Sequence, residues 1–246
     1  KTRPWFQGIV QCDGHGAYKV LAKKVDGIEL CGCWAHVRRK FHEALGSAHS
    51  AQAEWILRQI GLLYAIEKKL REKKIGPRDA PRLCLSVRAS ESRPIVARIK
   101  KALMLFKARP SILPQSLLGR ATDYALSQWE TLEVFLKDGR VEIDNNGVEN
   151  AIRPTALGKK NWLFVGGADT GDRSAILYSI IESCRRRGIE PYGYLSDVLA
   201  RVPDATTQDV YSLTPEGWAK DRAARTSACA SEETPASSSS RCAWTR

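Results

Sequence analysis

Two acidic side chains lie in settings where carboxylates often do chemistry. Asp13 follows the apolar run FQGIVQC and precedes Gly14, and Glu149 lies in the run IDNNGVENAIRP. Oxygen ligands of this kind bind Mg²⁺ or Mn²⁺, usually one or two carboxylates together with waters and substrate phosphates. The pair therefore suits metal-dependent phosphodiester chemistry, provided that the fold joins two positions separated by 136 residues.

Each acid also has an ordinary structural interpretation. Asn146 is a good helix N-cap, and Glu149 three residues later completes the spacing of a capping box, in which the glutamate satisfies free N–H groups. Asp13 before Gly14 is a common turn. Arg153, one helical turn after Glu149, is placed either to pair with that acid or to reach a DNA phosphate. The spacing alone leaves these alternatives open.

Basic residues flank both acids. Arg38, Arg39 and Lys40 form a run that suits phosphate binding, although such runs are usually solvated helix faces. Lys159 and Lys160 precede NWLFVGG, a run that we expect to be buried, and Asn161 begins it. These three residues would lie at the mouth of the run and follow the DNA backbone or simply face solvent.

Cys33 and His36 form a Cys-x-x-His pair between the two acids. A structural zinc site normally takes four ligands in two paired groups, which this pair alone does not supply, so we do not expect zinc. We expect Cys33 to pack in a strand and His36 to be satisfied near the start of a helix.

The elements that would position these residues follow a β-α-β-α order at the start of the chain. FQGIVQCDG and IELCGCWA have the pattern of short buried strands, while GAYKVLAKK and HVRRKFHEAL have that of helices. Asp13 then lies at the carboxyl end of a strand, where ligand sites of open α/β sheets are found. From about residue 50 to 137 the strand signals vanish and apolar residues recur at helical spacing.

This pattern predicts an α/β core interrupted by a large helical insertion, in a chain that is helix-rich overall. We assign residues 1–48 to the first part of the core and 49–138 to the insertion. Residues 139–204 would complete the core with Glu149 and the C-terminal helices, and 205–225 would form a C-terminal segment. The Ser-rich end, 226–246, has almost no apolar periodicity and is expected to be disordered.

The amino-acid composition indicates which class of partner and which cellular compartment to expect. Lys and Arg outnumber Asp and Glu by 39 to 27, which gives a net charge of +12 and favours a polyanion such as nucleic acid. Seven cysteines without a secretory leader indicate reduced thiols and a cytoplasmic protein. No apolar run is long enough for a membrane span, and a start at Lys1 without Met suggests the C-terminal piece of a longer protein.

Several motifs together resemble a known family. VQCDGHGAY, GCWAHVRRKF, EIDNNGVENAIRPTALGKKNWLFVGG, RSAILYSIIESCRRRGIEPYGYLSDVL and LTPEGWAK are similar, in order and spacing, to the C-terminal part of bacterial transposases of the insertion-sequence sixty-six family. The resemblance covers roughly residues 5 to 222. It implies a DDE transposase with an RNase H-like core, in which three acids hold two Mg²⁺ or Mn²⁺ ions for cleavage and transfer of DNA strands.

The same resemblance assigns roles to individual residues. Asp13 corresponds to the second acid and Glu149 to the third, both catalytic and metal-binding, while the first acid would lie on an earlier strand without a counterpart in this sequence. The Cys-x-x-His signature seen after the second acid in several such groups gives His36 a supporting role, which we extend to Asn145 and Asn146. Asn150 departs from the family, since many relatives have Arg after the glutamate.

The family also implies partners. These are double-stranded DNA at element ends and target, a homo-oligomer assembled on that DNA, and possible accessory proteins encoded by the element. Without the first acid, the chain alone is expected to bind DNA and to cleave it poorly. Two rivals remain open: a non-catalytic basic DNA-binding remnant or domesticated module, and an RNase H-like nuclease acting on RNA or hybrids.

Overall fold

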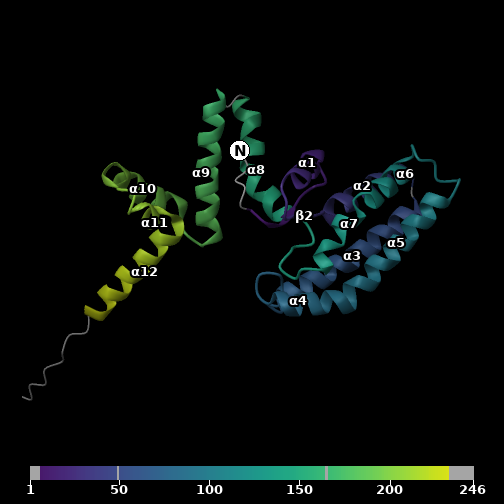
Figure 1. Cartoon of the computed structure of the whole chain (residues 1–246), viewed down its shortest axis with the longest axis horizontal. Helices are drawn as coiled ribbons and strands as arrows, with labels where there is room; N and C mark the ends of the chain where they lie inside the picture. The colour runs from purple at the N-terminus through teal and green to yellow at the C-terminus, as the bar shows by residue number, and fades with distance from the viewer. Residues whose placement is uncertain (1–5, 49, 164–165, 233–246) are drawn as a thin grey trace, which may run out of the picture. The chain divides into compact units, whose positions relative to one another are not determined.

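The computed structural model describes residues 6–48, 50–163 and 166–232 of the chain (Figure 1). The chain divides into two compact units, Lys1–Ile152 and Arg153–Arg246. The boundary falls within helix α8 (Asn146–Trp162), so this helix contributes residues to both units.

The first unit begins with a β-α-β motif, as the sequence predicts. Strands β1 (Gly8–Gln11) and β2 (Ile28–Cys31) are parallel, and helix α1 (Gly16–Lys24) connects them. The pairing continues past the ends of the strands, because the Cys12 amide donates to the carbonyl of Cys31 at 2.9 Å. Within the described residues the sheet has these two strands, so the chain is helix-rich with a small parallel sheet.

The predicted helical middle is confirmed. Its elements are α2 (Trp34–Ala48), α3 (Ala51–Glu72), α4 (Pro81–Val87), the π-helix η1 (Arg88–Ser92), α5 (Arg93–Ala108), α6 (Leu117–Ser127), α7 (Trp129–Leu132) and the 3-10 helix η2 (Val134–Leu136). Helices α2, α3, α5 and α6 pack side by side (Figure 1). Serine side chains cap two of them: Ser50 accepts from the Ala53 amide at the start of α3, and Ser116 accepts from the Gly119 amide at the start of α6.

Apolar stripes of these helices form one core. The helical spacing of apolar residues on α5 gives one buried stripe, from Ile95 through Ile99 to Phe106. On α3, Leu62 is 44% exposed while Ile60 and Leu63 are fully buried, although all three are apolar. The buried side of α3 is set by contact with α2 and α5, which the apolar letters of one helix do not specify.

A charged pair is buried inside this core. Arg88 donates to both carboxylate oxygens of Glu67 at 2.7 and 2.8 Å, and both side chains are fully buried. The guanidinium also donates to the carbonyls of Phe135 and Val141 at 3.0 and 2.8 Å. Arg88 thereby joins α3 to the segment that leads from η2 towards α8.

The second unit has its own small core. It comprises the rest of α8 and α9 (Ala168–Arg186), α10 (Pro191–Arg201), the 3-10 helix η3 (Val202–Asp204), α11 (Val210–Leu213) and α12 (Pro215–Glu232). Cys184, Ile189, Tyr194 and Val198 are buried there. Gly188, with φ +67°, ends α9 after its terminal arginines, and Pro191 begins α10.

Two expectations for this part of the chain differ from the structure. We expected NWLFVGG to be buried, but α8 continues through Trp162 and Leu163 is 74% exposed; Phe164 and Val165 lie outside the described residues. We expected disorder from residue 226, but α12 extends to Glu232; residues 233–246 lie outside the described part. The Ala-rich stretch before the Ser-rich tail favours helix continuation.

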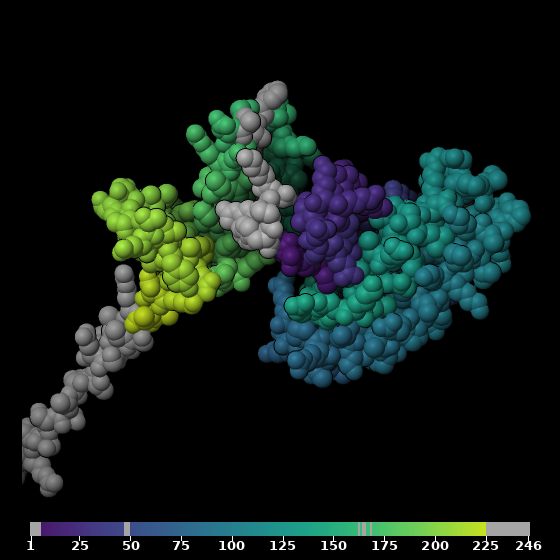
Figure 2. All heavy atoms as spheres, viewed as in Figure 1, coloured from purple at the N-terminus to yellow at the C-terminus, as the bar shows by residue number. Residues whose placement is uncertain are grey.

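No helix within the described residues combines the length and apolarity that a membrane crossing requires. Helix α1 has no fully buried residue and lies on the surface of the first unit, in purple in Figure 2.

Candidate functional site

Asp13 lies in a tight turn directly after β1. Its carboxylate accepts a hydrogen bond from the His15 amide at 3.0 Å, and its backbone carbonyl accepts one from the hydroxyl of Tyr124 at 3.0 Å. Gly14 has φ +83°, and a Cβ there would lie 3.0 Å from Oε1 of Gln128. The turn is the one that the Asp-Gly pair predicts, and side chains of the α6 region hold it from outside.

The segment before α8 is attached to the carboxyl ends of both strands. The Gln11 side chain donates to the carbonyl of Glu142 at 2.7 Å, and the Trp34 amide donates to the carbonyl of Ile143 at 3.2 Å. Gln11 is the last residue of β1, and Trp34 begins α2 shortly after β2. These contacts bring the start of α8, which carries Glu149, to the end of the sheet where Asp13 lies.

Glu149 is paired with the helix that follows β2. Its Oε1 lies 3.4 Å from Nε2 of His36, whose side chain is 14% exposed while that of Glu149 is 46% exposed. His36 is in the first turn of α2, where free N–H groups and the helix dipole favour a nearby carboxylate. Glu149 thus keeps one side open to solvent, as a residue that binds a ligand must.

The capping-box interpretation of Glu149 is not what the structure contains. Helix α8 begins one residue earlier than that interpretation requires, because Asn145 supplies the carbonyl that accepts from the Val148 and Glu149 amides. The Asn146 amide is satisfied by Oδ1 of Asp144 at 3.1 Å, so it needs no glutamate. A closer side chain, Asp144, performs the cap and leaves Glu149 available.

The predicted supporting residues occupy different environments. Asn145 is buried, and its Oδ1 has no hydrogen-bond partner among the described residues; the same holds for Nδ1 of His36. Asn146 is exposed and donates through Nδ2 to Asp144 at 3.0 Å. His36 therefore contacts the candidate acid directly, whereas Asn146 acts on the cap of α8.

Three buried thiols, at Cys12, Cys31 and Cys33, lie at or just after the carboxyl ends of the two strands. Burial raises the pKa of Cys31 to about 12, and the neighbouring Cys12 adds to that rise. Burial also raises the pKa of Cys33, while backbone N–H groups of Asn145 and His36 oppose the rise by hydrogen-bonding its sulfur. The thiols therefore stay protonated and act as small packing groups. Cys33 packs as predicted, but it lies after β2, which ends at Cys31, and not in the strand.

The described residues include no group of three or more His, Cys, Asp and Glu side chains that could hold a metal ion. The donors at this end of the sheet are instead the separate carboxylates of Asp13 and Glu149. Hard oxygen donors of this kind suit Mg²⁺, which commonly takes one or two carboxylates and completes its shell with waters and substrate phosphates.

The predicted DNA-binding residues fall into two sets. Arg38 and Arg39 are exposed on α2, close enough to affect the pKa values of Tyr64 and Tyr124, respectively, which burial raises and these cations lower. Lys40, also exposed, pairs with Glu43 at 3.4 Å. The other set lies in the second unit, exposed along α8, and consists of Arg153, Lys159, Lys160 and Asn161.

Sequence reasoning missed four residues of this site: Gln11, Tyr64, Tyr124 and Asp144. Tyr64 and Tyr124 belong to helical stripes that read as core, and both are only partly buried because their hydroxyls reach towards the site. For Asp144 a signal existed, since an Asp side chain commonly accepts from the backbone N–H two residues on.

Comparison with known proteins identifies the family. Residues 2–173 match the model of the Transposase IS66 family, and residues 179–215 match that of the IS66 C-terminal element. No solved structure is matched.

Relatives in Sinorhizobium fredii (strain NBRC 101917 / NGR234) are named as uncharacterized proteins. Protein y4jD is 34% identical over 224 residues, which cover 88% of this chain and 42% of the relative; y4hP is 33% identical over 234 residues, covering 89% and 41%. The chain thus spans less than half the length of these relatives. Because the family model covers well over half of the chain, the protein belongs to the IS66 family of transposases.

Proposed function

We propose that this chain carries two of the acids of a DDE-type transposase, Asp13 and Glu149, and that the intact protein cleaves and transfers DNA strands at the ends of an insertion sequence. The observation that carries the proposal is the attachment of the segment before α8 to the carboxyl ends of β1 and β2, through Gln11 and Trp34. That attachment supports a position of Glu149 at the same end of the sheet as Asp13.

The β-α-β start fits part of an RNase H-like core, with residues 49–138 as an insertion within it. The parallel pair β1–β2 and the return of the chain at Glu142 support this assignment. Further strands of such a core, and its first acid, would come from elsewhere in the intact protein.

Asp13 and Glu149 would hold Mg²⁺ or Mn²⁺. When bound, the ions would activate a water or a 3′-hydroxyl and stabilise the leaving oxygen of the phosphodiester. His36 would keep the Glu149 carboxylate in place from the first turn of α2. Arg38 and Arg39 would bind DNA phosphates beside the site, as the basic chain as a whole favours.

The partners proposed are double-stranded DNA at the element ends and the target, further copies of the protein on that DNA, and accessory proteins of the element. A cytoplasmic location fits this role and the free buried cysteines.

To test this, the chain is titrated with Mn²⁺ in the presence of a short DNA duplex. Electron paramagnetic resonance measures how much Mn²⁺ is bound. We expect Asp13→Asn and Glu149→Gln each to weaken Mn²⁺ binding by at least tenfold, while DNA affinity measured at fixed salt stays the same or rises. Weaker DNA binding without any change in Mn²⁺ affinity would show that Asp13 and Glu149 do not bind the metal.

Two other outcomes would select the rivals. A chain that binds DNA but shows no Mn²⁺ binding sensitive to either acid is a non-catalytic basic module. Reconstituted intact protein that cleaves RNA–DNA hybrids but not duplex DNA ends would instead be an RNase H-like nuclease.

A further inference from the structure

Two tyrosine hydroxyls connect the helical middle of the first unit to the two halves of the site. On α6, Tyr124 donates to the backbone carbonyl of Asp13 at 3.0 Å. On α3, Tyr64 donates to Oδ2 of Asp144 at 2.8 Å. These bonds join residues 111 and 80 positions apart, so both depend on the tertiary fold.

The contact of Tyr124 is part of a wider support for the strand ends. The Gln128 side chain limits the room beside Gly14, and the Gly32 amide after β2 donates to the carbonyl of Thr131 on α7 at 2.9 Å. The Trp34 indole donates to the Leu132 carbonyl at 3.0 Å. Helices α6 and α7 therefore hold the backbone just beyond both strands, and the Tyr124 hydroxyl is the group that reaches Asp13 itself.

The contact of Tyr64 acts on Glu149 through the cap of α8. Besides accepting from Tyr64, Asp144 accepts from the amide and the side-chain nitrogen of Asn146, the first residue of α8, at 3.1 and 3.0 Å. Fixing Asp144 thus fixes where the helix begins, and Glu149 lies in its first turn. The hydroxyl stays a donor, because burial and the Asp144 carboxylate raise the pKa of Tyr64.

We propose that Tyr124 and Tyr64 are positioning residues, which let the helical middle set the places of Asp13 and Glu149, respectively. This inference rests on the proposed function, in which those acids bind metal. Neither tyrosine would touch the metal or the DNA. Outer partners of metal-binding groups typically affect metal affinity by about 10–100-fold, so losing one hydroxyl has a measurable effect.

The experiment uses Tyr124→Phe and Tyr64→Phe, which remove one oxygen and keep each ring. Tyr192→Phe is the matched control, since that side chain is 79% exposed in the second unit. Mn²⁺ affinity is measured with the DNA duplex present, and only variants with an unchanged circular dichroism spectrum and a cooperative melt are compared. We expect each site variant to weaken Mn²⁺ binding by about tenfold and the control to leave it unchanged.

Hydrogen exchange followed by mass spectrometry provides a readout that does not require metal. Tyr124→Phe should speed exchange in the peptide that contains residues 12–15 and leave 145–149 unchanged, and Tyr64→Phe should do the reverse. A general loss of stability would instead speed exchange over the whole first unit.

The outcomes separate the two proposals. If Asp13→Asn and Glu149→Gln weaken Mn²⁺ binding but both tyrosine variants behave as Tyr192→Phe does, the positioning roles are wrong and the proposed function stands. If the acid variants leave Mn²⁺ binding unchanged, the proposed function fails. Unchanged exchange at 12–15 in Tyr124→Phe and at 145–149 in Tyr64→Phe would overturn the positioning roles in either case.

Discussion

At the scale of single residues, the first unit depends on a few polar side chains that have no exposure to water. The pair of Glu67 and Arg88 is the clearest, since the guanidinium uses its donors on the carboxylate and on two backbone carbonyls. Removing one partner would leave the other charge buried without compensation, and that loss is more costly than the pair itself is stabilising.

We therefore expect Glu67→Ala to lower the free energy of unfolding by about 3–5 kcal/mol. The neighbouring Lys68→Ala breaks only a surface pair, at 3.7 Å from Glu72 with Lys68 75% exposed, and should change stability by less than about 0.5 kcal/mol. Urea denaturation of both variants measures the difference. Equal losses for the two would mean that Arg88 finds other partners when Glu67 is absent.

The buried thiols give stability a dependence on alkaline pH. Cys31 has its pKa raised from an ordinary value of 9.0 to about 12. Between these values the unfolded chain loses this proton while the folded chain keeps it, so stability is full below pH 9 and falls as the pH rises towards 12. The expected slope from this one thiol is about −1.4 kcal/mol per pH unit.

Unfolding free energies measured at several values between pH 8 and 10.5 check this expectation. Cys31→Ala will be less stable throughout because it leaves a cavity, but its slope above pH 9 should be shallower than that of the unchanged chain. Parallel curves for the two proteins would show that Cys31 does not titrate in this way.

At the scale of elements, sequence periodicity predicted the types of element well and their contacts poorly. The two short strands, the helical middle, the end of α9 before Gly188 and the start of α10 at Pro191 follow from local apolar spacing and turn residues. The side of α3 that is buried, and the use of Tyr64 and Tyr124 hydroxyls at the site, depend on partners far along the chain. Such contacts leave no periodic trace in the sequence.

The candidate site likewise has features that the sequence predicts and features that depend on tertiary contacts. Asp13 and Glu149 were found because their residue types and the family motifs mark them. The pairing of Glu149 with His36 instead of a capping box could not be predicted, because it requires α8 to begin one residue earlier and to meet the first turn of α2. Buried Asn145 likewise looked no different from its exposed neighbour Asn146.

Two glycines differ in how closely other elements approach them, and we expect Gly→Ala to have opposite effects on stability at the two positions. A Cβ at Gly139, in the turn after η2, would lie 1.8 Å from the carbonyl oxygen of Pro81, so Gly139→Ala must shift the backbone at the start of α4. We expect a loss of about 1–3 kcal/mol. Gly61 lies exposed within α3 with nothing within 4 Å of its Cβ position, so Gly61→Ala should stabilise by about 0.5–1 kcal/mol.

Thermal unfolding of the two alanine variants and of the unchanged chain measures both effects, the loss of stability in Gly139→Ala and the gain in Gly61→Ala. A neutral Gly139→Ala would mean that the turn and α4 separate without cost, and the segment leading to Glu142 would then be less firmly held than the structure indicates.

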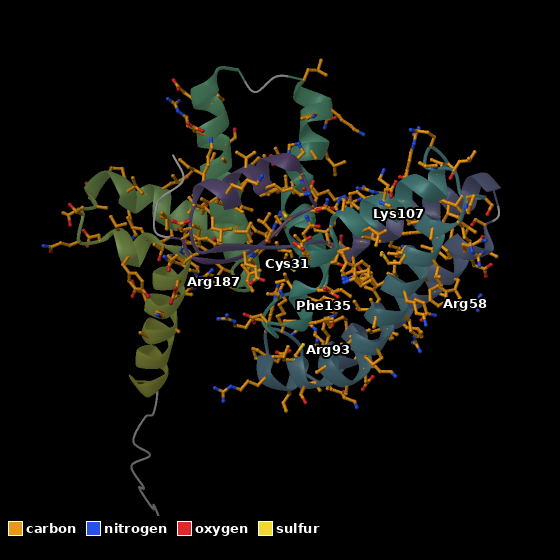
Figure 3. All side chains as sticks on the ribbon, turned by 45° about the vertical axis from the view of Figure 1, so that its right-hand side comes forward. Cys31, Arg58, Arg93, Lys107, Phe135 and Arg187 are labelled. Carbon is orange, nitrogen blue, oxygen red and sulfur yellow. The ribbon has the colours of Figure 1, made fainter. Side chains whose placement is uncertain are left out.

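At the scale of the whole molecule, the question is which of the exposed basic residues bind DNA. Arg38 and Arg39 belong to the first unit, and Lys159 and Lys160 to the second. Arg58 and Lys107 mark a different region of the first unit, well away from Cys31 at the end of β2 (Figure 3). All of these side chains are exposed and carry the same charge.

Charge reversal at each pair tests where DNA binds. We expect Arg38→Glu with Arg39→Glu to weaken binding of a duplex and to reduce the slope of log affinity against log salt by about 0.9 per lost phosphate contact. Arg58→Glu with Lys107→Glu applies the same change in charge and should weaken binding less and leave the slope nearly unchanged. Lys159→Glu with Lys160→Glu reports on the second unit separately.

The hydrogen bond from Gln11 to Glu142 also has a consequence for the order of folding. It closes a stretch of chain 131 residues long, and closing a flexible loop of that length costs roughly 4 kcal/mol in entropy. Once α2 to α7 have folded, Glu142 is carried back beside the strands and most of that cost has already been met. The site should thus assemble last, and a mutation deep within the helices could prevent its assembly without touching any of its residues.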